Sequence, residues 1–134
     1  MYKHILIATD GSELAKALGA TVTALTVADL FPTGPYSSIP LPSMVERYEA
    51  DAAESARKIL SSVSEAASKL GVVCDTMHIK DQTPAEGIIA AAREKACDLI
   101  VMASHGRRGV SRMLLGSQAQ KVVTISPVAV LICR

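Results

Sequence analysis

Apolar residues fall into five short runs along the chain, separated by segments rich in polar or turn-forming residues. These runs contain mostly Val, Ile, Leu and Ala and are nearly continuous, without strict alternation of apolar and polar positions. Such a pattern is typical of parallel strands that are buried on both faces. The sequence therefore predicts five buried strands, at residues 4–9, 21–27, 72–79, 97–103 and 127–133.

Helical patterns occupy the segments between these runs. After a loop at residues 30–42 that holds four prolines, apolar positions recur at steps of three and four up to Gly71. The recurring positions are Val45, Tyr48, Ala52, Ala56, Ile59, Val63, Ala66 and Leu70. One long helix is predicted there, with its stripe packed on the sheet in preference to a coiled-coil partner. Shorter helices are predicted at residues 84–95 and 117–124.

Each of these three helices is preceded by a capping-box pattern, Ser or Thr followed three residues later by Glu or Gln. The pairs are Ser43 with Glu46, Thr83 with Glu86, and Ser117 with Gln120. In such a box the hydroxyl caps the helix while the longer side chain reaches back to the capping residue. We expect all three helices to begin at these residues, the second with proline at its first helical position.

The connection between the first two strands is unusually short. Residues 10–20 carry a helical pattern in Leu14, Ala15 and Leu18. A helix of about seven residues rises only about 10 Å, less than the strand that it must run back along. Either this helix is truncated or residues are absent from the sequence. We hypothesise a missing segment between Ser12 and Ala17.

Strict alternation of strand and helix predicts one α/β domain over residues 1–134, built as a doubly wound five-stranded parallel sheet with helices on both faces. Ligands of such sheets bind beyond the carboxyl ends of the strands, where the strand order reverses. That rule selects three loops, at residues 10–12, 28–30 and 104–115.

Composition narrows the classes of ligand and compartment. Hydrophobic residues make up 49% of the chain and aromatic residues 3%, which disfavours recognition of nucleic acid by base stacking. A net charge of +1 offers no broad attraction to nucleic acid or to acidic membranes. Cys74, Cys97 and Cys133 are odd in number and lie among apolar residues, as expected of reduced thiols. With no secretion signal and no run long enough to span a membrane, we expect a soluble cytoplasmic protein.

The third loop has the chemistry of an anion site. It contains Gly106, Gly109 and Gly116 and leads directly into the helix that begins near Ser117. Glycines allow backbone N–H groups to approach an anion, and a helix N-terminus presents unpaired donors with partial positive charge. A phosphate group is therefore the expected ligand of this loop. From the residues alone, an alternative stays open in which the glycines only make turns and Ser117 only caps its helix.

Taken as a whole, the stretch VMASHGRRGVSRMLLGSQAQKVVTISPVAVLICR resembles the carboxyl-terminal half of the universal stress protein family. That family's signature is G-x2-G-x9-G-[ST]; here Ala103 takes the first glycine position, followed by Gly106, Gly116 and Ser117 at the family spacing. The segments ILIATDGSE and TALTV match the family as well. The resemblance covers nearly the whole chain and implies a Rossmann-like fold with strand order 3-2-1-4-5.

The resemblance implies ATP as ligand, with or without Mg²⁺, and assigns roles to the matching positions. Asp10, with Thr9, would lie near the adenosine or the metal, and Val27 would contact the base. The ribose and phosphate side would be lined by Met102, Ala103, His105 and Gly106. The phosphates would be held by Gly116, Ser117, Gln118 and Ala119.

Other roles stay open for some of these residues. Asp10 could serve a turn with Ser12, Val27 and Met102 could be core residues, and His105 could be a solvated loop residue. The family also differs from this chain at Ala103 and in its longer first crossover helix. The methyl group of Ala103 matters only if that position needs positive φ or a close approach of the ligand.

The function expected from the resemblance is that of an ATP-binding stress-response regulator, a homodimer paired through the last strand, Pro127 to Cys133. The alternative is an interaction module of the same fold whose nucleotide site does not function, which Ala103 alone favours. An enzyme is disfavoured, because neither an aspartate cluster nor a P-loop lysine motif is present. Any ATP hydrolysis would be slow and incidental.

Overall fold

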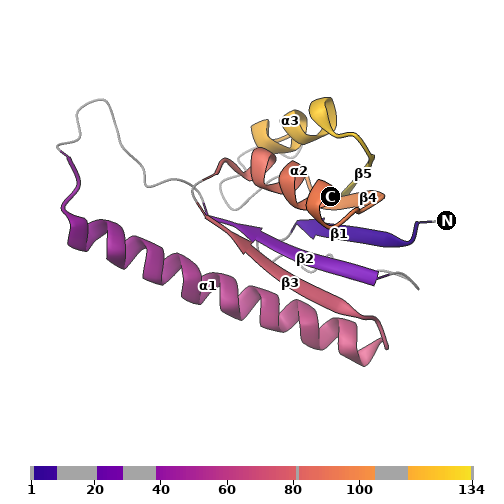
Figure 1. Cartoon of the computed structure of the whole chain (residues 1–134), viewed down its shortest axis with the longest axis horizontal. Coiled ribbons are helices and arrows are strands. Elements are labelled where there is room, and N and C mark those ends of the chain that lie inside the picture. Colours follow the sequence, from indigo (N-terminus) through magenta and orange to yellow (C-terminus); the bar gives the residue numbers. More distant parts are fainter. Residues whose placement is uncertain (1, 9–20, 29–38, 81, 105–114, 134) are drawn as a thin grey trace.

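Five parallel strands form the sheet of this protein, as seen in a computed structural model that describes residues 2–8, 21–28, 39–80, 82–104 and 115–133. The strands are β1 His4–Ala8, β2 Thr21–Val27, β3 Cys74–Ile79, β4 Leu99–Ala103 and β5 Ala129–Cys133. The helices are α1 Pro42–Lys69, α2 Pro84–Glu94 and α3 Ser117–Ile125 (Figure 1). The strand order is β3-β2-β1-β4-β5, which confirms the predicted doubly wound α/β fold.

The helices divide between the two faces of the sheet (Figure 1). On one face Leu25 of β2 packs in a core with Ile88 of α2 and Val122 of α3. On the other face Ala24 packs against Leu60 of α1. Because successive strand residues point to opposite faces, the adjacent pair Ala24 and Leu25 serves both layers. Both faces of β2 are thus buried, as the unbroken apolar run predicted.

The long helix α1 begins one residue before the predicted cap. Its N-cap is Leu41, in extended conformation, and Pro42 is its first residue, so the capping box predicted for Ser43 is wrong. Proline is suited to the first helical position because its fixed φ is already helical and its missing N–H is not needed there. Ser43 therefore lies inside the first turn and is exposed.

The apolar stripe of α1 agrees only in part with the prediction, since Ala56 and Val63 are buried as predicted. Its buried residues are Ala56, Leu60, Val63 and Ala67. Ile59 and Ala66, which the periodicity favoured, are only half-buried, and Leu70 is exposed. The first turns of α1 contribute no buried residue, and Figure 1 shows them extending beyond the tips of β2 and β3. The carboxyl-terminal half of the helix therefore makes the contact with the sheet.

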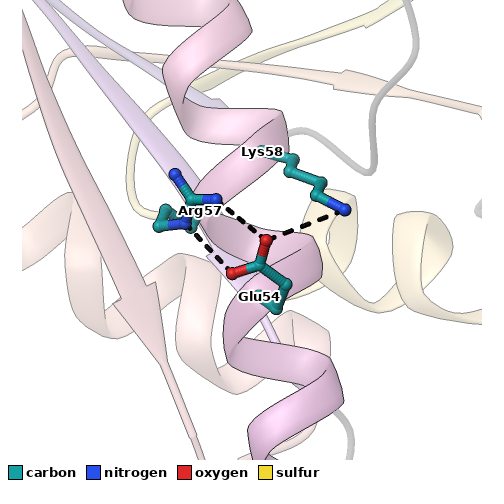
Figure 2. Close-up of polar contacts among 3 residues, drawn as sticks. All are labelled: Glu54, Arg57 and Lys58. Carbon is teal, nitrogen blue, oxygen red and sulfur yellow. Dashed lines mark hydrogen bonds and ion pairs between the residues drawn. The ribbon is translucent and has the colours of Figure 1, made fainter.

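On its solvent side α1 carries a small group of ion pairs (Figure 2). The Glu54 carboxylate accepts hydrogen bonds from Arg57 Nη2 at 2.8 Å and Arg57 Nε at 3.1 Å, and Lys58 Nζ lies 3.7 Å away. Hydrogen bonding to Arg57 lowers the pKa of Glu54. These pairs at spacings of three and four residues are exposed to solvent and stabilise the helix only weakly and locally. They belong to the helix surface and not to a site.

The connection between β1 and β2, which the sequence predicts to be short, lies outside the described residues. That holds for the predicted helical pattern at Leu14, Ala15 and Leu18 and for the hypothesised missing segment between Ser12 and Ala17. The structure fixes the two ends of this connection, Ala8 at the end of β1 and Thr21 at the start of β2.

Candidate nucleotide site

The strands that precede the three predicted ligand loops end side by side at one edge of the sheet. Ala8, the last residue of β1, is level with Leu25 of β2 on one side and Met102 of β4 on the other. Strand order reverses between β1 and β4, since β2 and β3 lie on one side of β1 and β4 and β5 on the other. The predicted ligand edge is therefore the reversal point of this sheet.

Two predicted nucleotide contacts direct their side chains into the core. Met102 is buried in the cluster shared with α2 and α3, and Val27 packs against the same cluster while remaining half-buried. Their side chains thus serve the core, which was the alternative left open by the sequence. Any contact of Val27 with a base would come from its backbone.

The backbone of Val27 is oriented toward β1. In β2, Thr21 N–H bonds to Lys3 on the β1 side, whereas Val22 and Ala28 N–H bond to residues on the β3 side. Because the two sides alternate along a parallel strand, the N–H and C=O of Val27 face the β1 side, two residues beyond the level of Ala8. These polar groups therefore point toward the edge where β1 ends.

Ala103, the departure from the family signature, occupies an ordinary strand position. It is the last residue of β4 and pairs with Cys133 of β5. Among the described residues other than glycine, Ala96 is the one with positive φ, so Ala103 has the conformation that any L-residue adopts. Alanine therefore imposes no backbone strain at this position.

Helix α3 begins differently from the prediction. Its N-cap is Gly116 and its first residue is Ser117, with no side-chain cap, so the capping box predicted for Ser117 and Gln120 is wrong. The first intrahelical bond runs from Gln120 N–H to the Gly116 carbonyl. In the part of the chain that the structure describes, no acceptor is assigned to the N–H groups of Ser117, Gln118 and Ala119. Since glycine has no side-chain acceptor, the N-cap residue itself does not occupy these donors.

The start of α3 is fixed to the end of β4. Gly116 N–H donates to the Ser104 carbonyl at 2.8 Å, and Ser104 N–H in turn donates to the Cys133 carbonyl at 2.9 Å. The two ends of the glycine-bearing loop therefore meet at the carboxyl edge of the sheet. This contact places the first turn of α3 beside the reversal point.

The side chains of the first turn of α3 have separate tasks. Ser117 is exposed, whereas Ala119 is buried in the core between α2 and α3. The Gln118 side chain accepts a hydrogen bond at its Oε1 from Ala85 N–H at 3.0 Å. The sequence does not predict this contact, because the two residues are 33 positions apart and no local pattern links them. Phosphate contacts from Gln118 and Ala119 would come from their N–H groups.

Four predicted site residues lie outside the described residues: Thr9, Asp10, His105 and Gly106. Within the described part of the chain, no group of three or more metal-ligating side chains is present. The same residues include no helix long and apolar enough to cross a membrane. The three cysteines, Cys74, Cys97 and Cys133, are free thiols.

The strand order and the helices on both faces define a Rossmann-like α/β protein, and comparisons identify its family. The chain belongs to the universal stress protein family, whose model matches residues 1–134. It is 34% identical over 143 residues to a universal stress protein of Thermus aquaticus, covering all of both chains. It is 32% identical over 145 residues to universal stress protein MJ0531 of Methanocaldococcus jannaschii, covering all of this chain and 83% of that one.

Solved structures agree on the fold. The structure of the hypothetical protein MJ0577 has a TM-score of 0.82 at 26% identity and covers 98% of this chain and 95% of its own. Two structures with less than 25% identity share the fold and hold adenine nucleotides. One is a universal stress protein in complex with cAMP (TM-score 0.64, 21% identity, 99% and 97% covered). The other is the Archaeoglobus fulgidus protein in complex with dAMP (TM-score 0.62, 17% identity, 99% and 98% covered).

The two sequence alignments are longer than the chain itself. They extend over 143 and 145 positions, whereas the chain has 134 residues. Each alignment therefore includes positions where the relative has a residue and this chain has none. The first crossover, between Ala8 and Thr21, is the connection that sequence analysis predicts to be shortened.

Proposed function

We propose that this protein is an ATP-binding regulator of the stress response. The observation that carries the proposal is the start of α3, where Gly116 leaves three successive backbone N–H groups without a side-chain cap at the reversal point of the sheet. Donors of this kind, reinforced by the helix dipole, suit a phosphate group. The backbone of Val27 at the same edge supplies a donor and an acceptor of the sort that an adenine base requires.

The related structures support an adenine nucleotide as the class of ligand. One holds cAMP and another dAMP, each on the same fold. The choice of ATP among the adenine nucleotides rests on the family signature at Gly106, Gly116 and Ser117. Mg²⁺, if bound, would come with the phosphates of ATP, and Asp10 is the residue that the resemblance assigns near it. The metal would neutralise phosphate charge there.

The conformation of Ala103 favours this proposal over an interaction module with a non-functional site. Substitution of the first signature glycine was the one argument for that alternative. Ala103 has an ordinary strand backbone without positive φ, so replacing glycine there causes no backbone strain, and the argument for a non-functional site is lost.

We further propose that the protein binds nucleotide without being an enzyme. The reduced state of its thiols suits a cytoplasmic location.

A second copy of this chain is the proposed protein partner, paired through β5. The two edges of the sheet differ in chemistry. Edge strand β3 carries the exposed charge of Asp75, which discourages strand pairing, whereas β5 has the uncharged sequence AVLIC with Leu131 52% exposed. Proteins usually protect edge strands with charges, so an unprotected apolar edge suits a self-pairing interface.

Substitution of Gly116 by aspartate or asparagine tests the site. The backbone of Gly116 (φ −59°, ψ 151°) accommodates any residue, and both substitutes are good helix caps. Asp would occupy the free N–H groups and place a negative charge beside the phosphates, whereas the isosteric Asn would occupy them without charge. We expect Gly116→Asp to bind ATP at least about tenfold more weakly than Gly116→Asn.

Calorimetric titration with ATP measures the effect, and thermal unfolding serves as its control. Both variants should unfold at or slightly above the wild-type temperature, because an N-cap side chain is added. Asn is expected to lower the affinity less than Asp, since it competes for the donors without repelling the ligand. Equal ATP binding by wild type and Gly116→Asp, or binding by neither, would refute the site.

A further inference from the structure

The first turn of α2 contains a buried backbone N–H, that of Ala85, which does not bond to the capping residues of the helix. The α2 capping box is confirmed: Thr83 is the N-cap, and the Glu86 carboxylate accepts from the Thr83 hydroxyl at 2.8 Å and from its N–H at 3.4 Å. Ala85, between them, is fully buried, and its N–H donates to Gln118 Oε1 of α3 at 3.0 Å. A side chain that is distant in sequence therefore accepts the hydrogen bond of this buried N–H at the start of α2.

The same hydrogen bond fixes the start of α3. This helix has nine residues, and its buried residues Ala119 and Val122 pack in the core that includes α2. One turn beyond Gln118, Lys121 Nζ lies 3.9 Å from Glu86 Oε1, an exposed and weak pair. The bond from Gln118 acts directly on the first turn of α3, next to the bond from Gly116 N–H to the Ser104 carbonyl at the cap of the same helix.

We propose that Gln118 is a positioning residue of the nucleotide site: its side chain anchors the first turn of α3 to α2, and the backbone of that turn thereby holds its direction toward phosphate. This inference rests on the proposed function. The N–H groups of Ser117, Gln118 and Ala119 take their direction from the helix, so a rotation of the first turn would misdirect all three together. The side chain of Gln118 bonds to α2 and does not contact the ligand, whereas the backbone N–H of the same residue donates to the phosphate.

Two variants of Gln118 break the anchor in different ways. Gln118→Leu keeps the bulk and removes the acceptor. Gln118→Asn keeps the amide but is one methylene too short to reach Ala85 N–H, so it tests whether an amide alone suffices. Gln120→Leu makes the same chemical change on the same helix at an exposed position and serves as the matched control.

The experiment measures the affinities of adenosine, AMP and ATP by calorimetry, and the exchange protection of the Ala85 amide by NMR. Both Gln118 variants should lose Ala85 protection and bind AMP and ATP about tenfold more weakly, equivalent to losing one charge-assisted hydrogen bond. Their affinity for adenosine should stay at the wild-type value. Gln120→Leu should match wild type in every measurement.

A purely structural role would give a different result. Unfolding temperature would then fall in the Gln118 variants while the ratio of ATP to adenosine affinity stayed at the wild-type value, and the inference would be overturned. Full Ala85 protection in either variant would overturn it as well. If wild type itself bound AMP and ATP no more tightly than adenosine, the proposed function would fail and this inference with it, a result distinct from the other two.

Discussion

At the scale of single residues, the two ends of the family signature behave differently. Ala103 is the last residue of a strand, where the backbone conformation suits any L-residue, so alanine in place of glycine causes no backbone strain. Gly116 caps a helix, where the lack of a side chain leaves donors free. A glycine signature therefore combines positions with different physical requirements. The requirement at Gly116 concerns hydrogen bonding more than φ.

Asp98 is a single residue whose charge should make stability depend on pH. Its carboxylate accepts hydrogen bonds from Lys3 N–H at 2.8 Å and His4 N–H at 3.0 Å, tying the start of β1 to β4. The bond from Lys3 is the main cause that lowers the pKa of Asp98 below its ordinary value of 3.8. Because the folded pKa is depressed, Asp98 stabilises the fold above pH 3.8, and this stabilisation is lost as pH falls through the folded pKa.

Asp98→Asn keeps an acceptor but removes the charge, so it should be less stable than wild type at neutral pH. The difference should be constant at pH values well above 3.8 and should shrink as the pH falls below 3.8, through the folded pKa of Asp98. Urea unfolding at a series of pH values measures both proteins under the same conditions. A stability difference that stays constant across this range would contradict the role given to the carboxylate.

At the scale of elements, the pattern located all five strands to within two residues, but it located helix starts less well. Of three capping-box patterns, the one at Thr83 is the cap of its helix. At Ser43 the helix begins two residues earlier than a serine cap requires, with Leu41 as cap and Pro42 as first residue. At Ser117 it begins one residue earlier, with Gly116 as cap. A local box shows that a cap is feasible, whereas neighbouring residues decide where the chain turns.

The register of the α1 stripe was ambiguous for a related reason. Ile59 and Leu60 are neighbours, as are Ala66 and Ala67, so the sequence offers two apolar stripes one residue apart. Periodicity alone cannot choose between them. In the structure, the stripe containing Leu60 and Ala67 is the one that packs on β2 and β3 and is buried.

Contact between α2 and β2 depends on Gly87. A β-carbon there would lie 2.9 and 3.0 Å from the two methyl groups of Val27. Glycine inside a helix normally costs up to about 1 kcal/mol relative to alanine, so close packing explains its presence. We expect Gly87→Ala to lower the free energy of unfolding by about 1–2 kcal/mol, because overpacking outweighs the gain in helix propensity.

A double-mutant cycle with Val27→Ala isolates the cause. Removing the two Val27 methyl groups vacates the space that the new β-carbon needs. Gly87→Ala should therefore cost little or nothing in the Val27→Ala background, giving a coupling energy of about 1 kcal/mol or more. Urea unfolding of the four proteins measures this coupling. If the two substitutions proved additive, the contact with Val27 would not be the source of the cost.

At the scale of the whole molecule, the sequence was informative about where the strand order reverses and less so about how the elements around that point are held together. Alternating elements predicted the reversal point, and the glycine spacing predicted that α3 begins near Ser117. The bond from Gln118 to Ala85 joins two helices that are far apart in sequence, and no motif marks it. Predicted roles for Thr9, Asp10, His105 and Gly106 stay predictions.

Assembly is the remaining property of the whole molecule, and the proposed interface through β5 predicts its response to charge. Leu131→Asp should abolish dimerisation, because a twofold interface loses two apolar side chains and gains two like charges. Losing the burial of two leucines weakens association by about a hundredfold or more. Val73→Asp, at a 68% exposed apolar position beside the opposite edge strand β3, is the matched control. Sedimentation equilibrium should give a dimer for wild type and Val73→Asp and a monomer for Leu131→Asp; a dimer that survives Leu131→Asp would place the interface elsewhere.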